Sequence, residues 1–145
     1  MRKWIIGAAA LAAAVTSMPA SAQQSTYKLG ALWTANRIAV EDGQFETYMD
    51  YLTRVWAENQ AFAKSQGWIL DYHILNTMNR RDGEPDLILL TRFNDFPSVA
   101  EIERRNDIIN KRMQQDDHSA EAASGQRNKM RKQIGSVMYR ELHKR

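Results

Sequence analysis

The sequence predicts an α+β domain, a four-stranded antiparallel sheet with two helices on one face. Four segments rich in branched and aromatic residues have the character of strands, and two longer segments carry apolar residues at helical spacing. The chain has 145 residues, the length of one domain of ordinary size. It contains no cysteine, so packing must hold it together without disulfides or cysteine-ligated metals.

The first residues resemble a secretory signal peptide. Arg2 and Lys3 precede the apolar run 4–15, and a small-residue motif, A-S-A, ends at Ala22. We expect cleavage after Ala22, a periplasmic or secreted protein, and no membrane insertion afterwards, because the run is shorter than the about 20 residues that span a bilayer. Loss of residues 1–22 removes two of the 20 basic residues and none of the 17 acidic ones, which leaves a net charge of +1. That charge argues against a nucleic-acid partner.

The domain itself is predicted to begin with a strand. Residues 23–28 are polar and without period, so we expect a flexible N-terminus there, and a single domain over 29–145. The segment 29–40 alternates roughly between apolar and polar residues and is predicted as the first strand. The turn-forming tripeptide E-D-G follows it.

A long amphipathic helix is predicted over 44–65. Its apolar stripe at helical spacing consists of Phe45, Met49, Leu52 and Trp56, with Tyr48 beside them. Asp42 is the expected N-cap and Gly67 the expected C-terminal stop. Aromatic residues at this spacing normally face the core, so we expect Tyr48 and Trp56 to pack inward.

Two strands joined by a turn come next. The segments 68–77 and 85–93 are rich in aromatic and branched residues, and the polar loop 79–84 between them contains the turn signal D-G. We therefore predict a hairpin. Alternation places Asp71 and His73 on one of its faces and Arg92 on the same face of the second strand.

The last third of the chain is predicted as a helix, a variable segment and a strand. Asn94, Asp95 and Pro97 precede the helix, and its apolar face carries Val99, Ile102, Ile109 and Met113. Residues 114–126 are polar and rich in alanine and serine, so they form either a loop or a poorly packed helical extension. We predict a short basic helical turn over 127–133, a strand over 134–142, and a tail over 143–145.

This order of elements, βαββαβ, is the ferredoxin-like pattern. Together with the segments GWILDYHIL, PDLILLTRFND and RKQIGSVMYREL, it resembles small exported proteins of the dimeric α+β-barrel superfamily, including NIPSNAP-like and antibiotic-biosynthesis-monooxygenase-like domains. The resemblance implies that two copies pair their bare sheet faces around a cavity. Members of the superfamily include cofactor-free monooxygenases and haem-binding proteins, so the shared fold transfers no particular activity.

Catalysis in such a cavity would fall to His73. We expect His73 to act as a general base oriented by Asp71, with Arg92 or Arg37 holding an anionic oxygen. The alternative is that Asp71, His73 and Arg92 form an ion-pair network with a structural role.

Four residues are candidates for binding a small apolar or anionic ligand: Trp33, Arg37, Trp68 and Tyr139. Trp33 and Arg37 share a face of the first strand, and Tyr139 shares a face of the last strand with Glu141. The aromatic rings supply apolar contact area and the guanidinium a fixed positive charge.

No cofactor or metal is expected. Asp116, Asp117 and His118 are adjacent, so their side chains diverge, and only His73 or His118 could ligate a haem. We therefore predict an exported homodimer that binds a small ligand in its cavity. The alternatives are a cofactor-independent monooxygenase-like enzyme and a structural or interaction module of the cell envelope.

Overall fold

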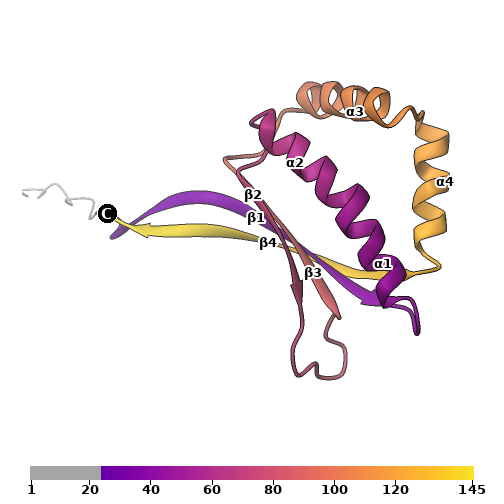
Figure 1. Cartoon of the computed structure of the whole chain (residues 1–145). Helices are drawn as coiled ribbons and strands as arrows, with labels where there is room; N and C mark the ends of the chain where they lie inside the picture. The colour runs from indigo at the N-terminus through magenta and orange to yellow at the C-terminus, as the bar shows by residue number, and fades with distance from the viewer. Residues whose placement is uncertain (1–23) are drawn as a thin grey trace, which may run out of the picture.

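The computed structural model describes residues 24–145, and the predicted signal peptide therefore lies outside the described residues. The four strands form one antiparallel sheet in the order β2-β3-β1-β4 (Figure 1). The strands are β1 (Tyr27–Val40), β2 (Asp71–Asn76), β3 (Leu87–Phe93) and β4 (Arg131–Lys144). The helices are α1 (Phe45–Tyr51), η1 (Leu52–Trp56), α2 (Ala57–Ser65), α3 (Val99–Met113) and α4 (Asp117–Arg127). The predicted α+β class and the four-stranded antiparallel sheet are confirmed.

The helix predicted over 44–65 is present as one continuous rod made of α1, a π-helical turn η1, and α2. It covers one face of the sheet (Figure 1). Tyr48 and Leu52 are buried as expected, and Trp56 packs against them. Gly67 follows the helix with φ of 70°, a conformation that glycine adopts without a Cβ penalty. Asp42 is not the N-cap, because Gln44 holds that position and makes no side-chain capping bond.

The core lies between this rod and the middle of the sheet. Ile38 of β1 and Leu87 and Leu89 of β3 point toward the rod and pack with Tyr48 and Leu52. Because side chains alternate along a strand, the residues between them point to the other side of the sheet. We call that side the open face, since none of the described helices covers it (Figure 1).

The second helical region differs from the prediction. Helix α3 begins at Val99, just after Pro97, and its N-cap is Ser98, whose hydroxyl accepts a hydrogen bond from the Glu101 amide at 3.2 Å. Neither α3 nor α4 contains a buried residue, so the expected packing of the apolar face of α3 on the sheet is wrong. The inward contacts of α3 are made by long cationic side chains: the Arg112 guanidinium lies 4.6 Å from the centre of the Phe62 ring. These contacts hold α3 against the end of α2 and away from the sheet.

Residues 114–126 belong largely to a separate helix, α4. Gln114 adopts a left-handed conformation that ends α3. Asp116 then begins α4 with a capping box, in which its carboxylate accepts from the Ser119 amide at 2.8 Å and the Ser119 hydroxyl accepts from the Asp116 amide at 2.9 Å. The local capping interactions explain how a segment without an apolar stripe forms a helix.

The outer strands are longer than predicted. β1 begins at Tyr27, within the segment expected to be flexible, and β4 runs from Arg131 to Lys144. The basic helical turn predicted over 127–133 ends earlier, because Arg127 closes α4, residues 128–130 form a turn and residues 131–133 already belong to β4. Most of the tail over 143–145 is strand. The two strands pair with each other from Tyr27↔Lys144 to Val40↔Arg131. Each long strand thus supplies the hydrogen-bond partners that stabilise the other.

Candidate functional site

The open face carries most of the residues that the sequence singled out. Strand register places Asp71 opposite Arg92, Arg92 opposite Trp33, and Trp33 opposite Tyr139, in one row across β2, β3, β1 and β4. His73 lies in the next row of the same face. The predicted side-chain alternation therefore brings five of the candidate residues together from four strands.

An ion pair lies at the centre of this row. Arg92 donates from Nε to Glu141 Oε1 at 2.6 Å and from Nη2 to Oε2 at 2.7 Å, a bidentate arrangement. The Trp33 indole donates to the same Oε1 at 2.7 Å, and His143 Nε2 lies 3.1 Å from Oε2. These hydrogen bonds, first from Arg92 and then from Trp33, lower the pKa of Glu141 to about 2. Glu141 is thus an anion whose acceptor sites are fully used.

Glu141 lies on the open face, and the sequence analysis did not identify it as the partner of Arg92. Its position on the same strand face as Tyr139 was readable from alternation. Its contact with Arg92 depends on the register of two strand pairs, β3 with β1 and β1 with β4. Only the folded sheet brings residues so distant in sequence together.

Asp71 and His73 form a second contact in the same region. His73 Nε2 lies 3.4 Å from Asp71 Oδ2, while Lys64 Nζ donates to Asp71 Oδ1 at 2.9 Å. The hydrogen bond from Lys64, followed by that from the Tyr72 amide, lowers the pKa of Asp71. The His73 ring stacks on Trp33 with centroids 6.0 Å apart and planes 21° apart. The carboxylate that orients His73 is therefore shared with a lysine.

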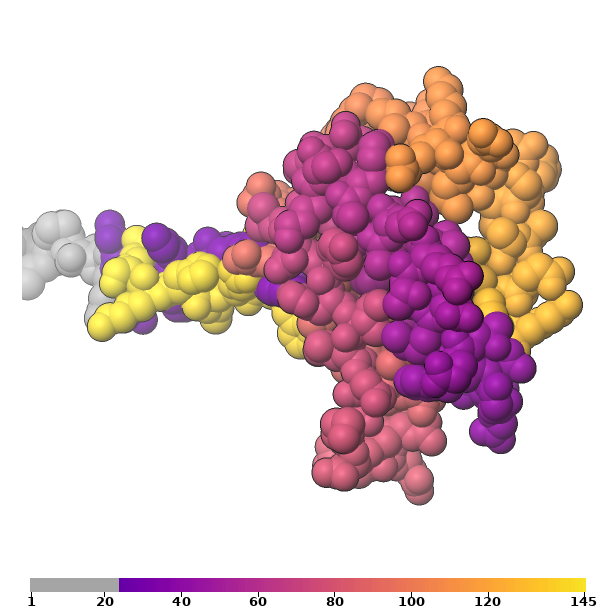
Figure 2. Space-filling view, viewed as in Figure 1, coloured from indigo at the N-terminus to yellow at the C-terminus, as the bar shows by residue number. Residues whose placement is uncertain are grey.

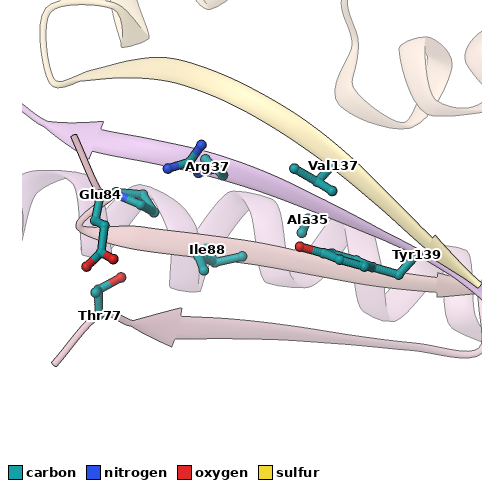
Figure 3. A pocket seen from close by; sticks show the side chains of 8 residues that line it. Ala35, Arg37, Thr77, Glu84, Ile88, Val137 and Tyr139 are labelled. Atoms are coloured by element: carbon teal, nitrogen blue, oxygen red, sulfur yellow. The ribbon is translucent and has the colours of Figure 1, made fainter. Parts of the chain in front are cut away.

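A hollow of about 350 Å³ opens on the same face, toward the β2–β3 turn (Figure 3). Its lining consists of Ala35, Arg37, Thr77, Glu84, Pro85, Ile88, Val137 and Tyr139. Figure 3 shows the Tyr139 ring reaching along the sheet toward Ala35, while Arg37 and Glu84 stand at the opposite end. We call this space the sheet-face hollow. It has an apolar floor and a polar end.

The polar end carries two opposite charges, those of Arg37 and Glu84. Arg37 Nη2 donates to the Gly83 carbonyl at 3.2 Å, and within residues 24–145 its guanidinium makes no ion pair with a carboxylate at 4.0 Å or less. The nearby Glu84 is held by Arg81, whose backbone amide and side chain lower the pKa of that carboxyl. The Thr77 hydroxyl is buried and has no hydrogen-bond partner among the described residues. The sheet-face hollow therefore contains a cation and a hydroxyl with unused hydrogen-bonding capacity.

Trp68 is the candidate that the structure places elsewhere. It lies between α2 and α3, edge-on to Phe62 with ring centroids 5.6 Å apart. The guanidinium groups of Arg105 and Arg104 lie 5.4 and 5.7 Å from its ring centre. Of the four predicted ligand-binding residues, Arg37 and Tyr139 line the sheet-face hollow and Trp33 is the register partner of Tyr139.

Metal and membrane features were searched in the same part of the chain. Residues 24–145 contain no group of three or more histidine and carboxylate side chains arranged to hold a metal ion. His118, the second histidine considered as a haem ligand, is exposed on α4. None of the helices in the described range is long and apolar enough to cross a bilayer.

Comparisons with known proteins add no assignment. No protein-family model, curated protein or solved structure matches this chain. The functional argument therefore depends on the geometry of the open face.

Proposed function

We propose that this protein binds a small apolar organic anion in the sheet-face hollow. The main support is the difference between two arginines of the open face. Arg92 is neutralised by Glu141, whereas Arg37 forms no ion pair with a carboxylate among residues 24–145. An anionic ligand group would take that place, and the apolar floor formed by Ala35, Ile88 and Val137 would contact its hydrocarbon body.

The hollow is open to solvent in the single chain, and a second copy is the proposed cover. Leu75, Val137 and Tyr139 are exposed on the open face at 45, 37 and 55%. Large apolar side chains exposed on both edge strands of one sheet face are compatible with an interaction surface. The βαββαβ order and the central position of β1 in the sheet are compatible with a ferredoxin-like domain, and pairing of two open faces would form the dimeric α+β barrel.

We further propose that this dimer works outside the cytoplasm. The support is the basic, apolar and A-S-A pattern of residues 1–22. The absence of cysteine is compatible with an oxidising compartment, because no thiol is present to be oxidised.

A monooxygenase-like enzyme is the second candidate, favoured by the contact of His73 with Asp71 and the aromatic ring beside it. It ranks second because both donor groups of Arg92 that face the site are used by Glu141. Arg92 therefore already binds a carboxylate, and these donors are not free to bind an enolate or another anionic oxygen.

The binding proposal is tested with a matched pair of fluorescent probes. Anilinonaphthalene sulfonate carries an anionic group on an apolar body, and phenylnaphthylamine is the same body without the charge. We expect saturable binding of the sulfonate, with the dissociation constant raised about tenfold in Arg37→Gln, since a charge-assisted hydrogen bond contributes about 1.5–3 kcal/mol. Binding of the neutral probe should be unchanged by the substitution.

Arg54→Gln is the control, because Arg54 lies on the helical rod with 79% of its side chain exposed and loses the same charge. Equal affinities of wild type, Arg37→Gln and Arg54→Gln for the sulfonate would contradict the proposal. A native mass spectrum of the wild type, recorded alongside, reports the number of subunits and any retained ligand mass. A clean monomer would contradict the proposed cover while leaving the Arg37 test valid.

A further inference from the structure

The two long strands extend beyond the rest of the sheet as a two-stranded ribbon. β3 pairs with β1 only from Leu32 to Ile38, whereas β4 pairs with β1 from Tyr27 onward. Figures 1 and 2 show the ribbon projecting as a narrow arm from the body of the molecule. A two-stranded ribbon without a third layer or strand is marginally stable in water. A surface packed on the ribbon would stabilise it.

One side of the ribbon carries large apolar side chains, with Arg140 between them and Lys144 at the tip. Alternation along β4 places Leu142 on the same side as Met138, and register places Leu29 beside Leu142. These three side chains are exposed at 62, 49 and 66%, respectively. This side belongs to the sheet face that carries the helical rod, opposite the open face. We call the side chains of Tyr27, Leu29, Met138 and Leu142 the ribbon stripe.

A second hollow lies at the base of the ribbon on this side. It has a volume of about 270 Å³ and is lined by Leu32, Thr34, Phe93, Asp95, Phe96, Pro97 and Met138. Phe96 is 63% exposed at its edge. The space would have been filled by α3 if that helix had packed on the sheet. We call it the ribbon-base hollow, and it accommodates apolar side chains of the size found at the ribbon tip.

We propose that the ribbon stripe packs against the ribbon stripe of a second copy, with the two ribbons antiparallel. Leu29 and Leu142 of each chain then enter the ribbon-base hollow of the other. The arrangement is isologous. The ribbon tip of each copy contacts the ribbon base of the other, and a two-fold axis relates the two contacts, so the interface is closed. A second copy is the favoured partner because the inserting side chains and the receiving hollow lie on the same side of one chain, about four residues apart along β4.

Charge is compatible with this contact. The ribbon tip is basic, with Lys144 opposite Tyr27 and Arg145 next to it. The rim of the ribbon-base hollow carries Asp95, whose side chain is 76% exposed. Arg140 lies near the expected two-fold axis, and it pairs with Asp95 at 3.6 Å and donates to the Gly30 carbonyl at 3.1 Å. Its charge is thereby directed away from the corresponding arginine of the second copy.

This contact is independent of the proposed ligand-binding dimer. It uses the face opposite the open face, so one chain can make both contacts, and a protein that makes both has at least four subunits when the assembly closes. Loss of the ribbon contact would leave the sheet-face hollow and its Arg37 unchanged. Each proposal can therefore fail without the other.

Engineered cysteines test the ribbon contact directly, because the natural chain has none. Leu142→Cys combined with Met138→Cys places two thiols four residues apart on one strand, about 13 Å. A disulfide needs Cα atoms within about 7 Å, so these thiols cannot pair within a chain. We expect mild oxidation to convert most of this variant of the full-length protein into a covalent dimer.

The control combines Leu142→Cys with Gln133→Cys, which lies toward the other end of β4 and outside the proposed contact. Its yield of covalent dimer should be at least tenfold lower. Equal yields from the two variants, or no covalent dimer from either, would overturn the proposal. In parallel, Leu142→Asp should halve the number of subunits measured by analytical ultracentrifugation while sulfonate binding remains at the wild-type level. An unchanged number of subunits would contradict the proposal as well.

Discussion

The two halves of this molecule use the same residue types with opposite results. In the core half, the rod α1–η1–α2 packs on β3 and the inner part of β1, and Leu89 is 5% exposed. In the outer half, the ribbon of β1 and β4 projects from the body of the molecule without a helix packed on it (Figure 1), and Leu142 is 62% exposed. Leucines in comparable strands are thus buried in the core in one half and exposed to solvent in the other. The difference shows that burial depends on which elements meet and not on the composition of a strand.

The largest expected effect comes from charging matched leucines in the two halves. Leu89→Asp buries an unpaired carboxylate in the core and should cost at least about 3 kcal/mol, which is a large part of a typical stability. We expect loss of the far-ultraviolet circular dichroism signal at ordinary temperature. Leu142→Asp should retain the wild-type spectrum. A folded Leu89→Asp protein would contradict the assignment of β3 faces.

A second, smaller effect concerns two glutamates with similar pKa values whose arginine partners lie at different distances along the chain. The pKa of Glu141 is lowered to about 2 by Arg92 and Trp33, and that of Glu101 to about 2 by Arg104 and Arg105. A lowered folded-state pKa means that the unfolded chain binds more protons in this range. The associated stability is complete above the ordinary value of 4.5 and is lost as the pH falls toward 2.

The two glutamates should nevertheless differ in their influence on global unfolding. Glu141 connects β4 to β3 across β1, a contact that unfolding abolishes, whereas Glu101 binds arginines of its own helical turns, which form locally. We expect Glu141→Gln to lower the melting temperature at neutral pH and to flatten its decline between pH 4.5 and 2. Glu101→Gln should change both less. Identical melting curves for the two variants would remove this distinction.

The smallest effect is expected at the start of α3. Ser98→Ala removes the capping hydroxyl and should destabilise the helix by about 1 kcal/mol. Because α3 has no buried residue, the loss should appear as local opening. Hydrogen exchange of the first amides of α3 should accelerate about fivefold, while exchange in β3 stays unchanged. Equal acceleration in both elements would show that α3 is coupled to the core after all.

The elements predicted most accurately from the sequence are those whose pattern reports a buried face. The rod was predicted over 44–65 because its aromatic spacing matches the core that it forms, and the β2–β3 hairpin was predicted from its turn and its apolar content. The segment 114–133 was predicted poorly. Its helix depends on the capping box of Asp116 and Ser119, and the start of β4 depends on pairing with β1, an interaction distant in sequence.

For the candidate site, alternation was sufficient to predict that Asp71, His73 and Arg92 share a face of the hairpin and that Trp33 and Arg37 share a face of the first strand. It was not sufficient to show how their charges are used. The sequence favoured Arg92 as the anion-holding residue, with Arg37 as an alternative. The register of β4 brings Glu141 to Arg92 and leaves Arg37 beside the sheet-face hollow.

The sequence by itself therefore determined the class of fold, the long helix, the hairpin and the side of the sheet on which the candidate residues lie. These follow from local periodicity, which each segment carries independently of its neighbours. The tertiary structure alone decided which arginine is neutralised, where α3 lies, and how far the ribbon extends. Those features depend on strand register and on contacts between residues distant in the chain, and no local pattern encodes either of them.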